Sequence, residues 1–177
     1  MGLNCGIDAC RYWRAIVTGV PSVVDDSLAL DSLGFHYYTL LRDFISIQNS
    51  SGYETLKSRG LELVDNDSLR HEIIQLYAFD YTILRKLEEE FTAAQYHETV
   101  YPRFNQLVGP FMQFDERGKP AGIDLPLTIS EADKKRLLLD LYSIEMNRRY
   151  MVHFYKQTKA NIQHLRNHIQ EALDLEA

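Results

Sequence analysis

The 177-residue chain contains only two cysteines, Cys5 and Cys10, both within its first ten residues. Two cysteines are too few for a disulfide scaffold, and no nearby cysteine or histidine completes a four-ligand zinc site. We therefore interpret both as structural or tail cysteines, and they say little about the redox compartment.

The chain also lacks a long apolar run and an excess of positive charge. A membrane-spanning helix needs about 20 mainly apolar residues. The best candidate, AIVTGVPSVV at 15–24, is interrupted by Gly19 and Pro21 and has no basic leader. Nineteen basic residues against twenty-five acidic ones give a formal charge of −6. Because no positive field attracts a phosphate backbone, we expect no nucleic-acid partner.

Recognisable catalytic motifs are missing as well. The sequence contains no glycine-rich phosphate loop, no nucleophile elbow and no paired metal-ligand motif. We therefore predict no catalytic residues and no cofactor, and we expect a protein that is not an enzyme. Hydrophobic residues make up 45% of the chain and charged residues 25%, which is typical of a globular protein with a core.

Apolar residues recur at helical spacing over most of the chain, which predicts an all-α antiparallel helical bundle. We treat residues 1–24 as an N-terminal segment, partly foreign to the natural protein, and residues 25–177 as a single bundle domain. The stretch FDERGKPAGIDLP is the clearest predicted loop. The expected helices are one at about residues 7–18, a second capped by Asp25 or Asp26, a short one ending at Gly60, and two long ones, from Asn66 to about His97 and from Thr128 or Ser130 through residue 172.

Residues 51–70, SGYETLKSRGLELVDNDSLR, contain closely spaced helix boundaries. Ser50 or Ser51 is expected to cap a short helix whose apolar positions are Tyr53 and Leu56, and Gly60 to end it in a left-handed conformation. The following residues then start the next helix: Leu61 and Leu63 are expected to point into the core, and Asn66 or Asp67 to act as the cap.

A compact charged group lies at the start of that helix. Its residue types suit ligand binding or acid–base chemistry, but capping and the helix dipole account for its acids without any substrate. Its members are Asp65, Asp67, Arg70, His71 and Glu72.

The C-terminal helix carries a stripe that steps alternately by four and three residues, as in a coiled coil. Two polar residues, Arg148 and Thr158, interrupt it. We expect Arg148 to pack its stem and hold its head in water; the alternative is a buried guanidinium with a carboxylate partner. The stripe comprises Leu137, Leu141, Ile144, Arg148, Met151, Tyr155, Thr158, Ile162, Leu165, Ile169 and Ala172.

His164 and His168 stand one turn apart in HLRNH and are the candidate metal ligands. The pattern lacks the Glu of H-E-x-x-H and names no third ligand, so a solvated helix face is the favoured interpretation.

The eleven tyrosines are numerous for a chain of this length. Core packing is the favoured use, and a shared ligand pocket is the alternative. The tyrosines considered for these two uses are Tyr37, Tyr38, Tyr77, Tyr81, Tyr142, Tyr150 and Tyr155.

The central block SGYETLKSRGLELVDNDSLRHEIIQLY (51–77) is followed by a Pro/Gly loop and then by the long C-terminal helix. This order resembles a family of uncharacterised bacterial proteins, a domain of unknown function with a basic N-terminal segment, one membrane span and a helical domain. The resemblance covers roughly residues 25–175 and implies no catalytic residues. The span is absent from this chain, and we favour a natural protein trimmed to its soluble domain. The location implied by the resemblance is the outer face of the bacterial cytoplasmic membrane. The matching positions are Tyr53, Leu56, Lys57, Ser58, Gly60, Leu61, Leu63, Asn66, Asp67, Ser68, Leu69 and Arg70.

Three functions follow as hypotheses. The first is a membrane-tethered helical domain that binds a protein partner or self-associates. The second is a metal-binding module or enzyme that uses His164 and His168. The third is a small-molecule sensor with a tyrosine-lined interior, which predicts a cavity with convergent polar groups.

Overall fold

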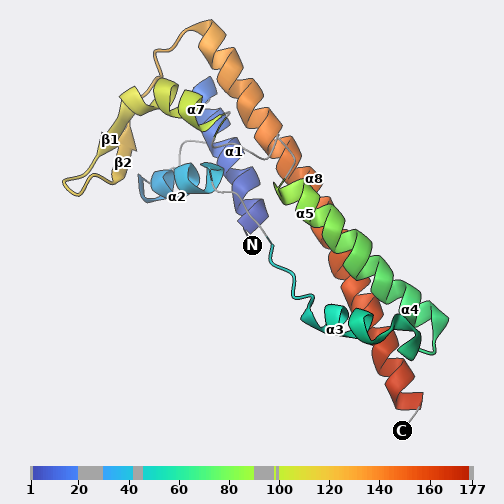
Figure 1. Cartoon of the computed structure of the whole chain (residues 1–177). Coiled ribbons are helices and arrows are strands. Elements are labelled where there is room, and N and C mark those ends of the chain that lie inside the picture. Colours follow the sequence, from blue (N-terminus) through green and yellow to red (C-terminus); the bar gives the residue numbers. More distant parts are fainter. Residues whose placement is uncertain (1, 20–29, 42–45, 90–97, 99, 176–177) are drawn as a thin grey trace. The chain divides into compact units, whose positions relative to one another are not determined.

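The computed structural model describes residues 2–19, 30–41, 46–89, 98 and 100–175. These residues are mainly helical, as predicted. They form two compact units, Met1–Phe44 with Thr92–Tyr150 (unit 1) and Ile45–Phe91 with Met151–Ala177 (unit 2). The long helix α8 (Glu131–Leu175) is continuous and contributes residues to both units (Figure 1).

Unit 1 is built around the side chains of Trp13 and Phe104, which are almost wholly buried and meet edge to face at 4.8 Å between ring centroids. The N-terminal part of the α8 stripe, from Leu137 to Ile144, is buried in the same core. The helix predicted at residues 7–18 begins earlier, at Gly2. The elements of unit 1 are α1 (Gly2–Thr18), α2 (Leu30–Leu41), α7 (Tyr101–Val108), a 3-10 turn (Gly109–Phe111), β1 (Met112–Phe114), β2 (Pro120–Ile123) and the first part of α8.

The stretch predicted to be a loop, residues 114–126, contains the turn and the second strand of a small antiparallel hairpin, and the last residue of its first strand. Met112 pairs with Ile123 and Gln113 with Gly122, and the register shifts after Gln113. The turn is organised by Asp115, whose Oδ1 accepts the backbone N–H groups of residues 117 and 119, each at 2.8 Å. Strands of three and four residues are too short to produce a recognisable alternation, and their glycine and proline content is typical of loops. The loop prediction was therefore wrong for Phe114 and for Pro120–Ile123, and the rest of the stretch is turn or irregular as predicted.

Arg148 is 3% exposed, so the prediction that its head reaches water was wrong. Its guanidinium donates to the backbone carbonyl oxygens of Gly6 (2.7 Å), Thr39 (3.0 Å) and Leu40 (2.6 Å). A Cβ atom at Gly6 would lie 2.4 Å from Nη1 of Arg148, so any larger residue there would have to displace the guanidinium. The donors of one buried side chain thus join α1, α2 and α8.

Unit 2 contains α3 (Ser51–Arg59), a 3-10 turn (Leu61–Leu63), α4 (Asp67–Ile74), a π-helical turn η3 (Gln75–Asp80), α5 (Tyr81–Glu89) and the remainder of α8. The prediction of two long α-helices is confirmed only for the C-terminal one, because the π-helical turn divides the run from Asp67 to Glu89. The predicted end near His97 and the predicted caps Asp25 and Asp26 lie outside the described residues.

Within unit 2, the α4–α5 run and α8 pack in opposite directions. As the residue number rises along the first, the number of its partner on α8 falls. The three contacts that show this are Glu72 with His168, Asp80 with Asn161, and Glu88 with Tyr155.

The helix boundaries of residues 51–70 are confirmed in part. Asn66 caps α4, and its Oδ1 accepts the Leu69 N–H at 3.1 Å. Neither Ser50 nor Ser51 is the side-chain cap of α3: Asn49 Oδ1 instead accepts from the backbone N–H and the hydroxyl of Ser51. Gly60 has a positive φ of 111°, but its ψ of 122° lies outside the left-handed helical region. One burial prediction for the same stretch was wrong: Leu63 was expected to point into the core, but it is 63% exposed.

Candidate ligand-binding site

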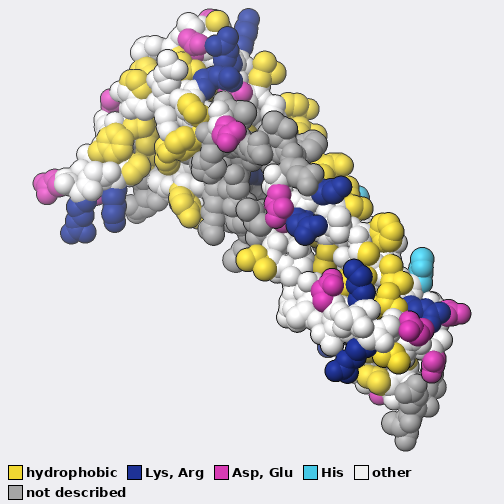
Figure 2. Space-filling model, viewed as in Figure 1, with side chains coloured by type: hydrophobic (Ala, Val, Ile, Leu, Met, Phe, Trp, Pro, Cys, Tyr) yellow, Lys and Arg dark blue, Asp and Glu magenta, His cyan; other side chains and the backbone are white. Residues whose placement is uncertain are grey.

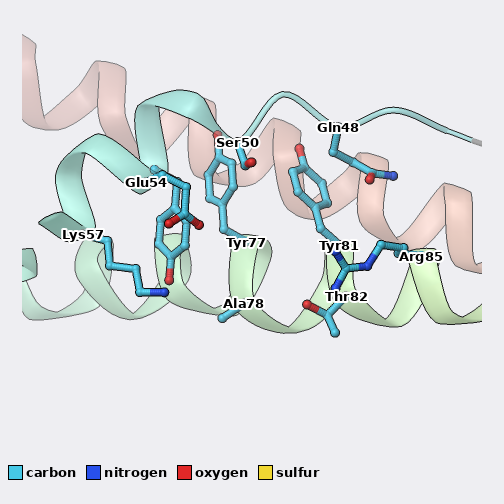
Figure 3. A pocket seen from close by; sticks show the side chains of 10 residues that line it. Gln48, Ser50, Glu54, Lys57, Tyr77, Ala78, Tyr81, Thr82 and Arg85 are labelled. Atoms are coloured by element: carbon cyan, nitrogen blue, oxygen red, sulfur yellow. The ribbon is translucent and has the colours of Figure 1, made fainter.

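Unit 2 contains an open pocket of about 390 Å³ on the side of its helical run (Figure 3). A volume of this size falls within the range of small-molecule sites. Three structural elements form its walls, namely the segment before α3, α3 itself, and the run from η3 into α5. The lining residues are Gln48, Ser50, Tyr53, Glu54, Lys57, Tyr77, Ala78, Tyr81, Thr82 and Arg85.

Three tyrosines make the aromatic part of the wall. The rings of Tyr53 and Tyr77 stack in parallel, with centroids 4.8 Å apart, and Tyr81 meets Tyr77 edge-on at 5.2 Å. Burial raises the pKa of Tyr81, with nearby Tyr77 and Asp80 acting in the same direction, so its hydroxyl stays protonated at neutral pH. Figure 3 shows the hydroxyls of Tyr77 and Tyr81 directed toward the segment that carries Gln48 and Ser50.

The π-helical turn and the start of α5 together supply five of the lining side chains. Tyr77, Ala78, Tyr81, Thr82 and Arg85 all line it, and their spacing of one, three, one and three residues places them on one face of the helical run. Turns of this kind are rare and occur frequently at functional sites.

Asp80 fixes the end of that turn. Its Oδ1 accepts from the side-chain amide of Gln75 at 3.2 Å, which spans the turn, and its Oδ2 accepts from Asn161 of α8 at 2.7 Å. One carboxylate therefore holds the turn closed and attaches it to α8.

Three charged side chains line the pocket, and two of them are cationic. Lys57 and Arg85 enter from opposite ends in Figure 3, with the ring of Tyr77 between them, and Glu54 lies near Lys57. Among the residues that the structure describes, no ion pair or side-chain hydrogen bond engages any of these three. Their charges are therefore available to a ligand.

The segment before α3 is held in place by a polar network. Gln48 donates its side-chain amide to Ser46 Oγ at 2.5 Å, and Ser46 donates through its backbone N–H and its hydroxyl to the two carboxylate oxygens of Glu88, at 3.0 and 2.5 Å. Tyr155 of α8 donates its hydroxyl to the same carboxylate. Burial is the main cause that raises the pKa of Tyr155, and the neighbouring Glu88 acts in the same direction. The Tyr155 hydroxyl therefore stays protonated and can donate. This network places Gln48 at the pocket wall.

The histidines predicted as metal ligands lie together, next to a carboxylate. Their ring centroids are 6.3 Å apart, and Glu72 Oε1 is 3.0 Å from His168 Nδ1 and 3.7 Å from His164 Nε2. Across the described ranges, however, no set of three or more His, Cys, Asp and Glu side chains is arranged to hold a metal ion. We therefore regard the group as a polar contact between α4 and α8.

Other residues singled out from the sequence take structural roles. Arg70 pairs with Asp67 and donates to the Val64 carbonyl oxygen at 3.0 Å, which stabilises the start of α4. Leu56 packs beside Tyr53 against the core of unit 2. Cys10 is a wholly buried free thiol, and the side chain of Cys5 lies outside the described part.

Unit 1 has a smaller cavity of about 240 Å³ beside its hairpin. Its wall is mainly apolar, and its polar edge is Tyr37, which donates to Asn105 Oδ1 at 2.7 Å. Burial raises the pKa of Tyr37 to about 12, so this hydroxyl also stays protonated. Because it offers no charged group to a ligand, we rank this cavity below the pocket of unit 2.

Sequence reasoning did not assign Gln48, Lys57, Thr82 or Arg85 to a site. The spacing of Tyr77, Tyr81 and Arg85 by four residues was the available signal, since it places them on one face of a helix. Gln48 carried no signal, because its position depends on tertiary contacts of a loop.

No family model, no curated protein and no solved structure matches this chain. The resemblance of the central block to a family of uncharacterised bacterial proteins therefore stays a prediction. Within the described residues, no helix is both long and apolar enough to cross a membrane.

Proposed function

We propose that unit 2 is a binding module for a small molecule, which occupies the pocket between α3 and α5. The observation that carries this proposal is the convergence of three tyrosines, three uncommitted charged side chains and the amide of Gln48 on one concave surface. Pockets that combine aromatic walls with a few placed polar groups are typical of ligand sites. The π-helical turn at its wall and the part-buried polar network behind Gln48 add support, since both hold the lining in a defined position.

The test is to fill the pocket and measure binding of ring-shaped probes. Ala78 is exposed at the pocket wall, so Ala78→Leu reduces the cavity without removing a buried contact. Ala160→Leu, on the exposed face of α8, is the matched control. We expect benzoate, benzamide or benzamidinium at millimolar concentration to shift amide resonances of residues 46–57 and 75–88 in ¹H–¹⁵N spectra, and Ala78→Leu alone to abolish the shifts. Absence of shifts with these three probes and with phenyl phosphate would contradict the proposal.

A second candidate function is association with a protein through α8, and a specific feature favours it. Four large side chains of unit 1 are exposed at helical spacing along α8, apart from the buried stripe, and Figure 2 shows hydrophobic side chains along the surface of this helix. Such a row marks an interaction surface more often than isolated apolar residues do. Its members are Leu139 (66% exposed), Tyr142 (56%), Met146 (45%) and Tyr150 (48%).

Light scattering after size exclusion tests self-association through this row. If a dimer forms, Leu139→Lys should convert it to the monomer, because Leu139 is the most exposed member of the row and a charge within an apolar contact is strongly unfavourable. Gln163→Lys, exposed on a different face of the same helix, is the control and should leave the dimer intact. A monomer at high concentration would contradict self-association and leave a different protein as the partner.

The antiparallel bundle predicted from the sequence is likewise a proposal. The reversed pairing of α4–α5 with α8 supports it within unit 2. Tethering to a membrane has only the resemblance in its favour.

A further inference from the structure

The charges of the unit 2 pocket specify the class of its ligand. We infer that the pocket takes a planar ring that carries an anionic group, a carboxylate or a phosphate. This inference rests on the proposed ligand-binding function and adds the sign and shape of the ligand.

The first argument is the balance of charge. Lys57 and Arg85 line the pocket against a single acid, Glu54, so the lining carries a net charge of +1. In the described part of the chain neither cation has an ion-pair partner on a neighbouring side chain. An anion bound between them would supply that partner, and charge-assisted hydrogen bonds are about twice as strong as neutral ones.

The second argument is the kind of donor present. The guanidinium of Arg85 is a planar group that can hold both oxygens of a carboxylate or two oxygens of a phosphate. The hydroxyl of Tyr81 remains protonated at neutral pH and adds another donor, as does the hydroxyl of Thr82 beside it. Donors therefore outnumber the acidic acceptors at the end of the pocket that Arg85 occupies.

The third argument concerns the tyrosine rings, and it disfavours a cationic ligand. An aromatic cage for a cation presents several ring faces to one point. Here the facing surfaces of Tyr53 and Tyr77 are covered by each other, because the rings stack with an interplanar angle of 5°. Tyr81 lies edge-on to Tyr77, at 75°. This arrangement presents no box of ring faces to an ammonium group.

The experiment compares four probes that share one ring and differ in charge. Benzoate, benzamide and benzamidinium are close in shape and carry charges of −1, 0 and +1, and phenyl phosphate separates phosphate from carboxylate recognition. Each is titrated into the full chain, and the shifts of amide resonances in residues 46–57 and 75–88 give the dissociation constant. We expect at least one of the two anions to bind about tenfold more tightly than benzamide, and benzamidinium to bind most weakly.

Three variants test which side chain selects the charge. Arg85→Gln should weaken binding of the preferred anion about tenfold, whereas Lys86→Gln, the adjacent exposed lysine outside the pocket, should leave it unchanged. Glu54→Gln should not weaken it. The effect of Arg85 should also shrink at high salt, because this side chain is exposed.

The outcomes separate the inference from the function on which it rests. Tightest binding of benzamidinium, weakened by Glu54→Gln, would overturn the anionic ligand and leave the binding pocket established. Equal effects of Arg85→Gln and Lys86→Gln would also overturn it, since the anion would then respond only to overall charge. If none of the four probes shifts the pocket resonances, the proposed function fails together with the inference.

Discussion

The rings of Tyr53 and Tyr77 lie parallel, with centroids 4.8 Å apart and an interplanar angle of 5°. Tyr53 comes from α3 and Tyr77 from the π-helical turn, so this stack joins two of the elements that frame the pocket. Tyr53 is also part of the buried core of unit 2. The same contact therefore contributes to stability and to the shape of the pocket, and changes to it should affect both.

Replacing Tyr77 tests this shared role. Tyr77→Ala removes a half-buried ring and its stacking contact with Tyr53, and should lower the free energy of unfolding by about 2 kcal/mol. Tyr77→Phe keeps the ring and should stay within about 0.5 kcal/mol of the wild type. Urea denaturation followed by circular dichroism measures both. The control is Phe79→Ala, because Phe79 is 54% exposed on the same turn; an equal loss in this variant would argue against the stack.

Substitution of Arg148 should destabilise unit 1. Arg148→Met leaves the carbonyl oxygens of Gly6, Thr39 and Leu40 without their buried donor, and unsatisfied buried groups cost about 1 to 3 kcal/mol each. We expect a total loss of about 3 kcal/mol in urea denaturation. Arg136→Met, at an exposed position of the same helix, should change stability by less than about 0.5 kcal/mol. Similar losses in the two variants would contradict the assigned role.

The buried thiol of Cys10 predicts a pH dependence. Burial raises its pKa to about 11, although the Arg148 guanidinium acts in the opposite direction. A raised folded-state pKa gives stability that is complete below the unfolded value near 9 and is lost as the pH rises toward 11. Between pH 8 and pH 10 the wild type should therefore lose about 1 kcal/mol more stability than Cys10→Ala. Parallel losses in urea denaturation at the two pH values would contradict this.

The polar contact between α4 and α8 distinguishes the two histidines. His168 lies 3.0 Å from Glu72 and is 24% exposed, whereas His164 lies 3.7 Å away and is 73% exposed. His168→Ala should lower the free energy of unfolding by about 1 kcal/mol, and His164→Ala by less than about 0.5 kcal/mol. Added zinc should leave the thermal midpoint unchanged. A midpoint that rises with zinc, and no longer rises in His164→Ala, would support the metal-site hypothesis instead.

Local sequence signals predicted those parts of the fold that depend on neighbours along the chain. Asn66 caps α4 and Ser130 accepts the Asp133 N–H at the start of α8, and both residue types are favoured because their side chains reach the first free N–H groups. The stripe from Leu137 to Ile144 is buried, as its spacing predicted. These features require no knowledge of the rest of the molecule.

Features that depend on distant contacts could not be predicted in this way. Arg148 appeared as a polar interruption of an apolar stripe, and only the approach of Gly6 and of the end of α2 provides its acceptors. The predicted burial of the stripe is wrong at two positions for the same reason, since Ile162 is 38% exposed and Ile169 37%. A spacing of three and four residues predicts that side chains share a helix face, but it does not predict that another element covers that face. A loop, a short helix and a π-helical turn form the pocket together. No pattern in the sequence predicts that these three elements meet.

The cap of α3 shows how a local signal can be assigned to the wrong residue, and it can be tested directly. Ser50 stands at the N-cap position without a side-chain cap bond, whereas Asn49 Oδ1 accepts the Ser51 N–H at 3.1 Å and the Ser51 hydroxyl at 2.8 Å. Asn49→Ala should therefore lower the free energy of unfolding by about 1 kcal/mol, while Ser50→Ala should change it by less than about 0.3 kcal/mol. Urea denaturation of the two variants, read against the wild type, measures the difference. Gln48 and Ser50 border the pocket on either side of Asn49, so Asn49→Ala should also weaken probe binding. If Ser50→Ala lowers the free energy of unfolding more than Asn49→Ala does, Ser50 and not Asn49 caps the helix.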